Sequence, residues 1–182
     1  DNIGAQLMSA LHNKKPERKD TLIRETLTDL RDIVNDATRK NLSFDEILAD
    51  LRLETVERLS SSGIIHNWWI KDDSQTEVSQ QIVHTLRSIV RETVSNIIKH
   101  SKAKQVTIKI KHTADTISLM VEDDGIGISL PDEHSEGGHY GNGLANIKSR
   151  VTNANGTLEF NNSNKGLQVL AEFPAQYEKT LS

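Results

Sequence analysis

The sequence of 182 residues has no cysteine and only 4% aromatic residues. The lack of cysteine excludes disulfides, cysteine-ligated zinc and thiol catalysis, and it is neutral about the compartment. Because aromatic side chains are scarce, leucine, isoleucine and valine must build the core. No apolar run approaches the roughly 20 residues of a membrane-spanning helix, and we expect no signal peptide. A basic excess is also missing, because 26 acidic residues face 22 basic ones; this argues against a general nucleic-acid-binding protein.

The residues that are present suit one compact domain with a helical appendage. Hydrophobic residues make up 35% of the chain and charged residues 26%, a mixture that buries a core and keeps the surface hydrated. The length of 182 residues agrees with this organisation. Because the first residue is Asp1 and not methionine, we expect the chain to be a piece of a longer protein.

Residues 1–41 show the apolar spacing of helices that pack along their length. Two stretches with intervals of three and four residues flank the polar segment His12–Asp20, which contains Pro16. The first stretch comprises Ile3, Leu7 and Ala10, and the second comprises Ile23, Leu27, Leu30, Val34 and Ala37. The spacing predicts a helical hairpin. One hairpin is a thin core, so we favour its pairing with a second copy over packing against the rest of this chain.

Residues 42–182 alternate between helix-like and strand-like periodicity. Along this segment we expect a helix from Ser43 to Gly63, a strand at 64–70, a helix at 77–100, strands near 106–110 and 117–121, a helix at 144–153, and strands near 158–160 and 167–173. This order predicts an α+β fold with helices on one face of a mixed sheet. We interpret Trp68 and Trp69 as packing in the core or on the sheet rather than as a binding platform.

The predicted helix 77–100 carries a row of polar side chains beside its apolar stripe. At 100° per residue, Glu92, Asn96 and Lys99 fall within about 60° of one another. An amide oxygen ligates Mg²⁺, a carboxylate holds a metal-bound water, and an ammonium group meets phosphate. Taken alone, the row is more typical of a solvated helix edge.

Two glycine clusters follow. In the first, Asp123, Gly125 and Gly127 come directly after a strand. The carboxylate offers an acceptor to an amine such as that of adenine, and the glycines let a flat ligand approach the backbone. A simple strand-closing turn has the same composition. The second cluster, Gly137–Asn146, leads into a helix, where free N–H groups suit phosphate, although a flexible linker also fits. It matches neither a Walker A loop nor a Rossmann fingerprint.

Together the three clusters resemble the ATP-binding domain shared by sensor histidine kinases, gyrase-type ATPases and Hsp90. Glu92–His100 is similar to the N box of that group, Asp123–Gly127 to its Asp-x-Gly-x-Gly box and Gly141–Leu144 to its Gly-x-Gly-Leu box. The resemblance covers roughly Ser43–Pro174. It implies an α/β sandwich of the histidine-kinase/Hsp90 ATPase type over residues 42–182, which follows a dimeric four-helix bundle built by residues 1–41.

The resemblance also implies roles for individual residues. Asn96 would coordinate Mg²⁺, and Asp123 would bind the adenine amine of ATP. The other residues that it assigns to ATP binding are Lys99, His100, Gly125, Gly127, Gly141, Gly143 and Leu144. Glu92 is a candidate for a catalytic base. Ser129–Tyr140 resembles a short ATP lid.

The start of the chain resembles a narrower group, the kinases related to the nitrate and lipid-fluidity sensors. Asp1–Leu7 is similar to the stretch that follows their phosphoacceptor histidine, so that histidine would directly precede Asp1. Asp1 would then accept the second ring proton of the histidine. Two departures are Ala5, where many relatives have a phosphatase glutamine, and Leu167, where many have a threonine beside the adenine.

The resemblance implies the cytoplasmic transmitter core of a two-component sensor kinase. The parent protein would be a homodimer that binds Mg–ATP, phosphorylates its own histidine and passes the phosphoryl group to a response-regulator receiver domain. We expect no nucleic-acid partner, and membrane attachment only through regions preceding this chain. The alternative is an ATP-binding regulatory module, such as an anti-sigma-like kinase or a nucleotide-gated interaction domain, without histidine phosphotransfer.

Overall fold

The computed structural model describes residues 43–74, 76–127, 142–163 and 166–175. The hairpin predicted for residues 1–41 lies outside this range, and the described residues from Phe44 onward belong to one compact unit. The elements are α3 (Phe44–Ser61), β1 (Ile65–Asp72), α4 (Gln80–Asn96), the π-helical turn η1 (Ile97–Ser101), β2 (Gln105–His112), β3 (Thr116–Asp123), α5 (Asn142–Asn153), β4 (Thr157–Ser163) and β5 (Gly166–Pro174).

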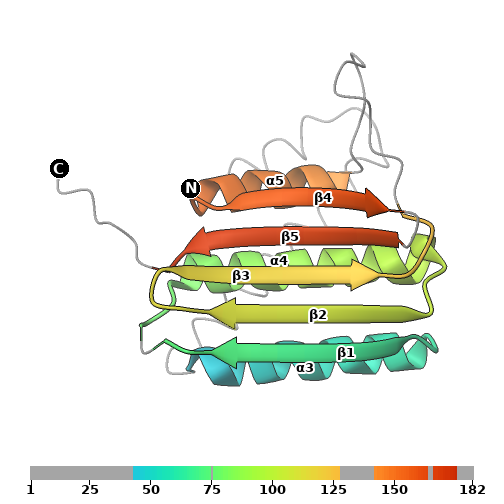
Figure 1. The fold of residues 1–182 in the computed structure, drawn as a ribbon, viewed down its shortest axis with the longest axis horizontal. Helices are drawn as coiled ribbons and strands as arrows, with labels where there is room; N and C mark the ends of the chain where they lie inside the picture. The colour runs from blue at the N-terminus through green and yellow to red at the C-terminus, as the bar shows by residue number, and fades with distance from the viewer. Residues whose placement is uncertain (1–42, 75, 128–141, 164–165, 176–182) are drawn as a thin grey trace, which may run out of the picture. The chain divides into compact units, whose positions relative to one another are not determined.

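The strands form one mixed sheet in the order β1-β2-β3-β5-β4. Strand β1 runs parallel to β2, and the other neighbouring pairs are antiparallel. Helices α3, α4 and α5 all lie on the same side of the sheet, behind it in Figure 1. The predicted order of elements and the predicted α+β architecture are therefore confirmed.

The core lies between this sheet and the three helices. Alternate residues of β2, β3 and β5 are buried, and α4 buries an apolar stripe against them. On β2 the buried apolar residues are Val106, Ile108 and Ile110, each at most 2% exposed. This alternation is the one expected from the period of two, because successive side chains on a strand point to opposite faces.

The interpretation of Trp69 as a residue packed in the core or on the sheet is wrong. Trp68 is partly buried against the core, but Trp69 is 65% exposed. Trp69 is in register with Lys109 of β2, so it stands on the face opposite α3, α4 and α5. Because β1 is the edge strand of the described sheet, none of the described strands shields the indole from the side.

Helix α4 differs from the predicted helix 77–100 at both ends. It begins at Gln80, where the Ser79 hydroxyl accepts the N–H of Ile82 at 3.3 Å. Regular α-helix ends at Asn96 and continues as the wider π-helical turn η1. The expectation of 100° per residue fails there, because a π-turn holds more residues than an α-turn.

None of the helices in the described ranges is long and apolar enough to cross a membrane.

Candidate functional site

The carboxylate of Asp123 is buried at the end of β3. The residue is 3% exposed, and its Oδ1 accepts the N–H of Gly125 at 2.8 Å. Burial raises the pKa of Asp123 above its ordinary value, and hydrogen bonds from the backbone of Gly125 and Leu167 oppose that rise. A buried carboxylate held by backbone donors is a fixed hydrogen-bond acceptor.

Its neighbour Asp124 has a different environment. Asp124 is exposed, and its Oδ1 accepts the N–H groups of Lys104 at 2.7 Å and Gln105 at 2.9 Å. These backbone hydrogen bonds lower the pKa of Asp124. Asp124 therefore holds the turn before β2, whereas Asp123 faces the interior.

Two glycines pack so tightly around Asp123 that neither leaves room for a side chain. A Cβ at Gly125 would overlap the carbonyl of Ser101, and a Cβ at Gly166 would overlap the backbone of Asp123. Gly166 also has φ +117°, a conformation that L side chains rarely adopt. The Ser101 carbonyl further accepts the N–H of Ile126 at 2.8 Å. The end of η1, the loop after β3 and the start of β5 thus meet at this carboxylate.

The loop after β3 meets β4 at a second close approach. Gly127 has φ +74°, and the position of its missing Cβ is taken by the side-chain amide of Asn162. Sequence reasoning missed both Asn162 and Ser101. Nothing in the local pattern marks either residue, because each reaches the site through contacts with segments far away in the chain.

Two members of the predicted polar row, Glu92 and Asn96, are joined by a hydrogen bond, and Lys99 lies beyond the end of α4, on η1. Asn96 Nδ2 donates to Glu92 Oε1 at 3.2 Å, and both side chains are half-buried. The Glu92 carboxylate lies against Gly143 in the first turn of α5, where a Cβ would overlap it. Lys99 and His100 are exposed on η1.

The remaining predicted site residues are placed as follows. Leu144 is partly buried against the core at the start of α5. Asp1, Gly141 and the predicted lid Ser129–Tyr140 lie outside the described residues. The described part of the site therefore has two components. One is the buried Asp123 carboxylate between Gly125 and Gly166, and the other is the Asn96–Glu92 pair on α4.

Residues 82–177 match the family described as histidine kinase-, DNA gyrase B- and HSP90-like ATPase. The chain belongs to this ATPase family, and membership implies ATP binding. The resemblance to sensor histidine kinases with this ATPase domain is confirmed by the relatives.

One relative is the signal transduction histidine-protein kinase/phosphatase DegS of Bacillus subtilis, 32% identical over 58% of this chain and 27% of that protein. Another is the sensor protein NarQ homolog of Haemophilus influenzae, 32% identical over 72% of this chain and 22% of that protein. The chain thus spans about a quarter of the length of these relatives. A blue-light activated histidine kinase of Erythrobacter litoralis shares the fold, with a TM-score of 0.63 at 18% identity over 99% of this chain and 58% of that one.

Proposed function

We propose that this chain is the cytoplasmic transmitter core of a two-component sensor histidine kinase. The parent homodimer binds Mg–ATP, phosphorylates a histidine directly before Asp1 and transfers the phosphoryl group to an aspartate of a response-regulator receiver domain. The observation that carries the proposal is the buried Asp123 carboxylate, bordered by Gly125 and Gly166 and joined through Ser101 to the helix that bears Asn96.

Asp123 and the glycines suit the adenine end of the nucleotide. A carboxylate in a buried position accepts a hydrogen bond from an exocyclic amine more strongly than it would in water, because competing water is excluded. The missing side chains at positions 125 and 127 let the Ser101 carbonyl and the Asn162 amide pack against the loop after β3, which fixes the backbone next to Asp123. Leu167 supplies a backbone N–H to Asp123, and its apolar side chain cannot hydrogen-bond the base.

Asn96 and Glu92 suit the metal end. Because Asn96 Nδ2 donates to Glu92, the amide oxygen is the group of Asn96 that would ligate Mg²⁺. Within the described ranges, no group of three or more His, Asp or Glu residues could hold a metal ion by itself. The Asn96 amide oxygen and the Glu92 carboxylate fit Mg²⁺, because this ion keeps several waters and binds through substrate phosphates rather than in an all-protein cage. When bound, the metal neutralises phosphate charge.

The phosphates would lie toward α5 and η1. The first turn of α5 around Gly143 and the neighbouring Gly141 would present backbone N–H groups to an anion. Lys99 and His100 would reach the phosphates from the exposed side of η1. Glu92 is the candidate base, and Asp1 would orient the histidine before it by accepting its second ring proton.

The raised pKa of Asp123 predicts an acid-sensitive nucleotide site. The ionised carboxylate is the acceptor, so affinity is present above the Asp123 pKa and lost as pH falls through it. Because burial raises that pKa, the loss of ADP affinity begins at a higher pH than an ordinary aspartate would give. Calorimetric ADP titrations from neutral into acid pH measure this. The control is Asp123→Asn, which lacks the titrating carboxylate, so its titrations show the pH dependence that comes from proton uptake by ADP itself. Equal pH dependence of ADP affinity in the wild type and in this variant would contradict the assignment.

A second expectation is that this chain does not phosphorylate itself, although a version extended by the upstream residues does. His12, the histidine closest to Asp1, is eleven residues further on, or roughly 16 Å along a helix at ~1.5 Å per residue. A phosphoryl group delivered beside Asp1 would miss it by far more than the ~3–3.5 Å required for attack.

The measurement is incubation with γ-labelled ATP and assay of acid-labile label on both versions. We expect label on the extended version alone, and we expect that label to be lost when the residue before Asp1 is replaced. Label on the short chain that disappears in His12→Gln would make His12 the acceptor and overturn the assignment.

A further inference from the structure

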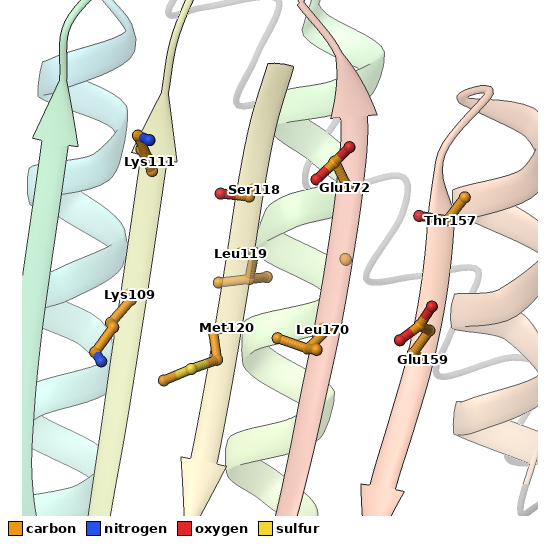
Figure 2. Close-up of a pocket in the computed structure, with 10 residues that line it drawn as sticks. Lys109, Lys111, Ser118, Leu119, Met120, Thr157, Glu159, Leu170 and Glu172 are labelled. Carbon is orange, nitrogen blue, oxygen red and sulfur yellow. The ribbon is translucent and has the colours of Figure 1, made fainter.

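The face of the sheet opposite the helices carries opposite charges on its two sides. Lys109 and Lys111 of β2 are exposed on one side, and Glu172 of β5 and Glu159 of β4 are exposed on the other. Figure 2 shows the lysines and glutamates flanking a central strip that includes Met120. We call the surface formed by these side chains and Leu170 the outer face.

The outer face is hollowed between its charged sides. A cavity of about 380 Å³ lies over β2, β3, β5 and β4. Its central residues are the small Ser118 and the half-buried Met120 and Leu170. The hollow gives long side chains from an opposing surface room to lie flat.

The charged groups of the outer face have no ion-pair partner among the residues that the structure describes. In that part of the chain, Lys71 pairs with Asp73 at 2.7 Å, and Arg91 pairs with Glu54 at 2.9 Å. Lys109, Lys111, Glu159 and Glu172 take part in no such pair. The face therefore offers two lysines and two glutamates to an outside partner.

The strand register makes Lys111 and Glu172 self-complementary across β3. Lys111 of β2 is opposite Ser118 of β3, which is opposite Glu172 of β5. A two-fold axis that runs along β3, in the plane between two stacked sheets, exchanges the positions of β2 and β5. It brings Lys111 of each copy over Glu172 of the other and places the β3 residues Met120 and Glu122 against their own counterparts. The Glu122 carboxylate accepts a hydrogen bond from the Gln168 amide at 3.3 Å. Such an isologous arrangement forms two Lys111–Glu172 pairs between the copies, one on each side of the axis.

We propose that the outer face is a docking surface for a second copy of this chain, with the two sheets stacked about an axis along β3. This contact is separate from the hairpin dimer proposed above. Five strands at ~4.8 Å spacing give a face about 20 Å wide. The buried area is then on the order of 1,000 Å² in total, which belongs to weak, transient interfaces.

The absence of cysteine from the chain gives a direct test by cross-linking. Met120→Cys puts one thiol at the proposed axis, and a short bismaleimide joins two copies that meet there. We expect it to cross-link faster than Leu53→Cys, which puts a thiol on α3 at a residue that is 70% exposed. Equal rates for the two proteins would overturn the proposal.

Charge reversal then tests the pairing. In the Met120→Cys background, Lys111→Glu alone or Glu172→Lys alone should each slow cross-linking about tenfold, because each turns two attractive pairs into two repulsive ones. Mixing these two proteins restores opposite charges at both contacts and should restore the rate. Both positions are exposed, so the circular dichroism spectrum should be unchanged. Failure of the mixture to cross-link faster than either protein alone would overturn the two-fold arrangement, and a different partner would then be the occupant.

Discussion

Replacing Asp123 by asparagine is expected to weaken ADP binding by roughly 10–150-fold, because a hydrogen bond to a charged group contributes about 1.5–3 kcal/mol. Thermal stability should not fall. Burial disfavours the charged form of Asp123 and raises its pKa, so a neutral amide of the same size removes a cost to the folded state. Calorimetry with ADP and Mg²⁺ measures the affinity, and a melting curve measures the stability.

The matched control for this substitution is Asp124→Asn, one residue further along. Asp124 is exposed and holds the backbone N–H groups of Lys104 and Gln105. Its low pKa reflects those bonds, so its substitution should lower the melting temperature and leave ADP affinity unchanged. An unchanged affinity in Asp123→Asn, or an equal loss in both variants, would remove Asp123 from the adenine role.

Replacing Gly166 by alanine is expected to destabilise the domain by about 2–6 kcal/mol. The backbone at φ +117° costs a non-glycine residue on the order of 1–3 kcal/mol. The added methyl group would also overlap the backbone of Asp123, and such overpacking costs roughly 1–3 kcal/mol more. Typical domains have only about 5–15 kcal/mol in total, so nucleotide binding should be impaired as well. Urea denaturation followed by circular dichroism gives the free energy of unfolding.

Gly63→Ala is the control that separates backbone strain from collision. Gly63 has φ +70°, but no heavy atom lies within 4 Å of the position that its Cβ would take. The left-handed conformation alone costs about 1–2 kcal/mol. Similar losses in Gly63→Ala and Gly166→Ala would show that the close approach to Asp123 contributes nothing.

Much of the fold could be predicted because its signals are local. Val106, Ile108 and Ile110 alternate with polar residues, and that alternation alone places one face of β2 inward. The glycine clusters and the polar row likewise indicated the ATPase family before any strand was paired. Glu92 and Asn96, four residues apart on α4, interact as helical spacing predicts.

Other features were decided by tertiary structure. The exposure of Trp69 follows from the place of β1 at the sheet edge, and the change from α-helix to a π-helical turn comes between Asn96 and Lys99.

The sequence by itself determined the element order, the buried faces and the three motifs, since each depends on residues close together in the chain. Only the tertiary structure decided what surrounds Asp123. The order β1-β2-β3-β5-β4 sets β5 beside β3, although more than forty residues separate Asp123 from Gly166. It also brings Asn162 to Gly127 and gathers opposite charges across the outer face. These contacts depend on which strands pair and in which register, and that choice is made by packing of the whole core rather than by any local pattern.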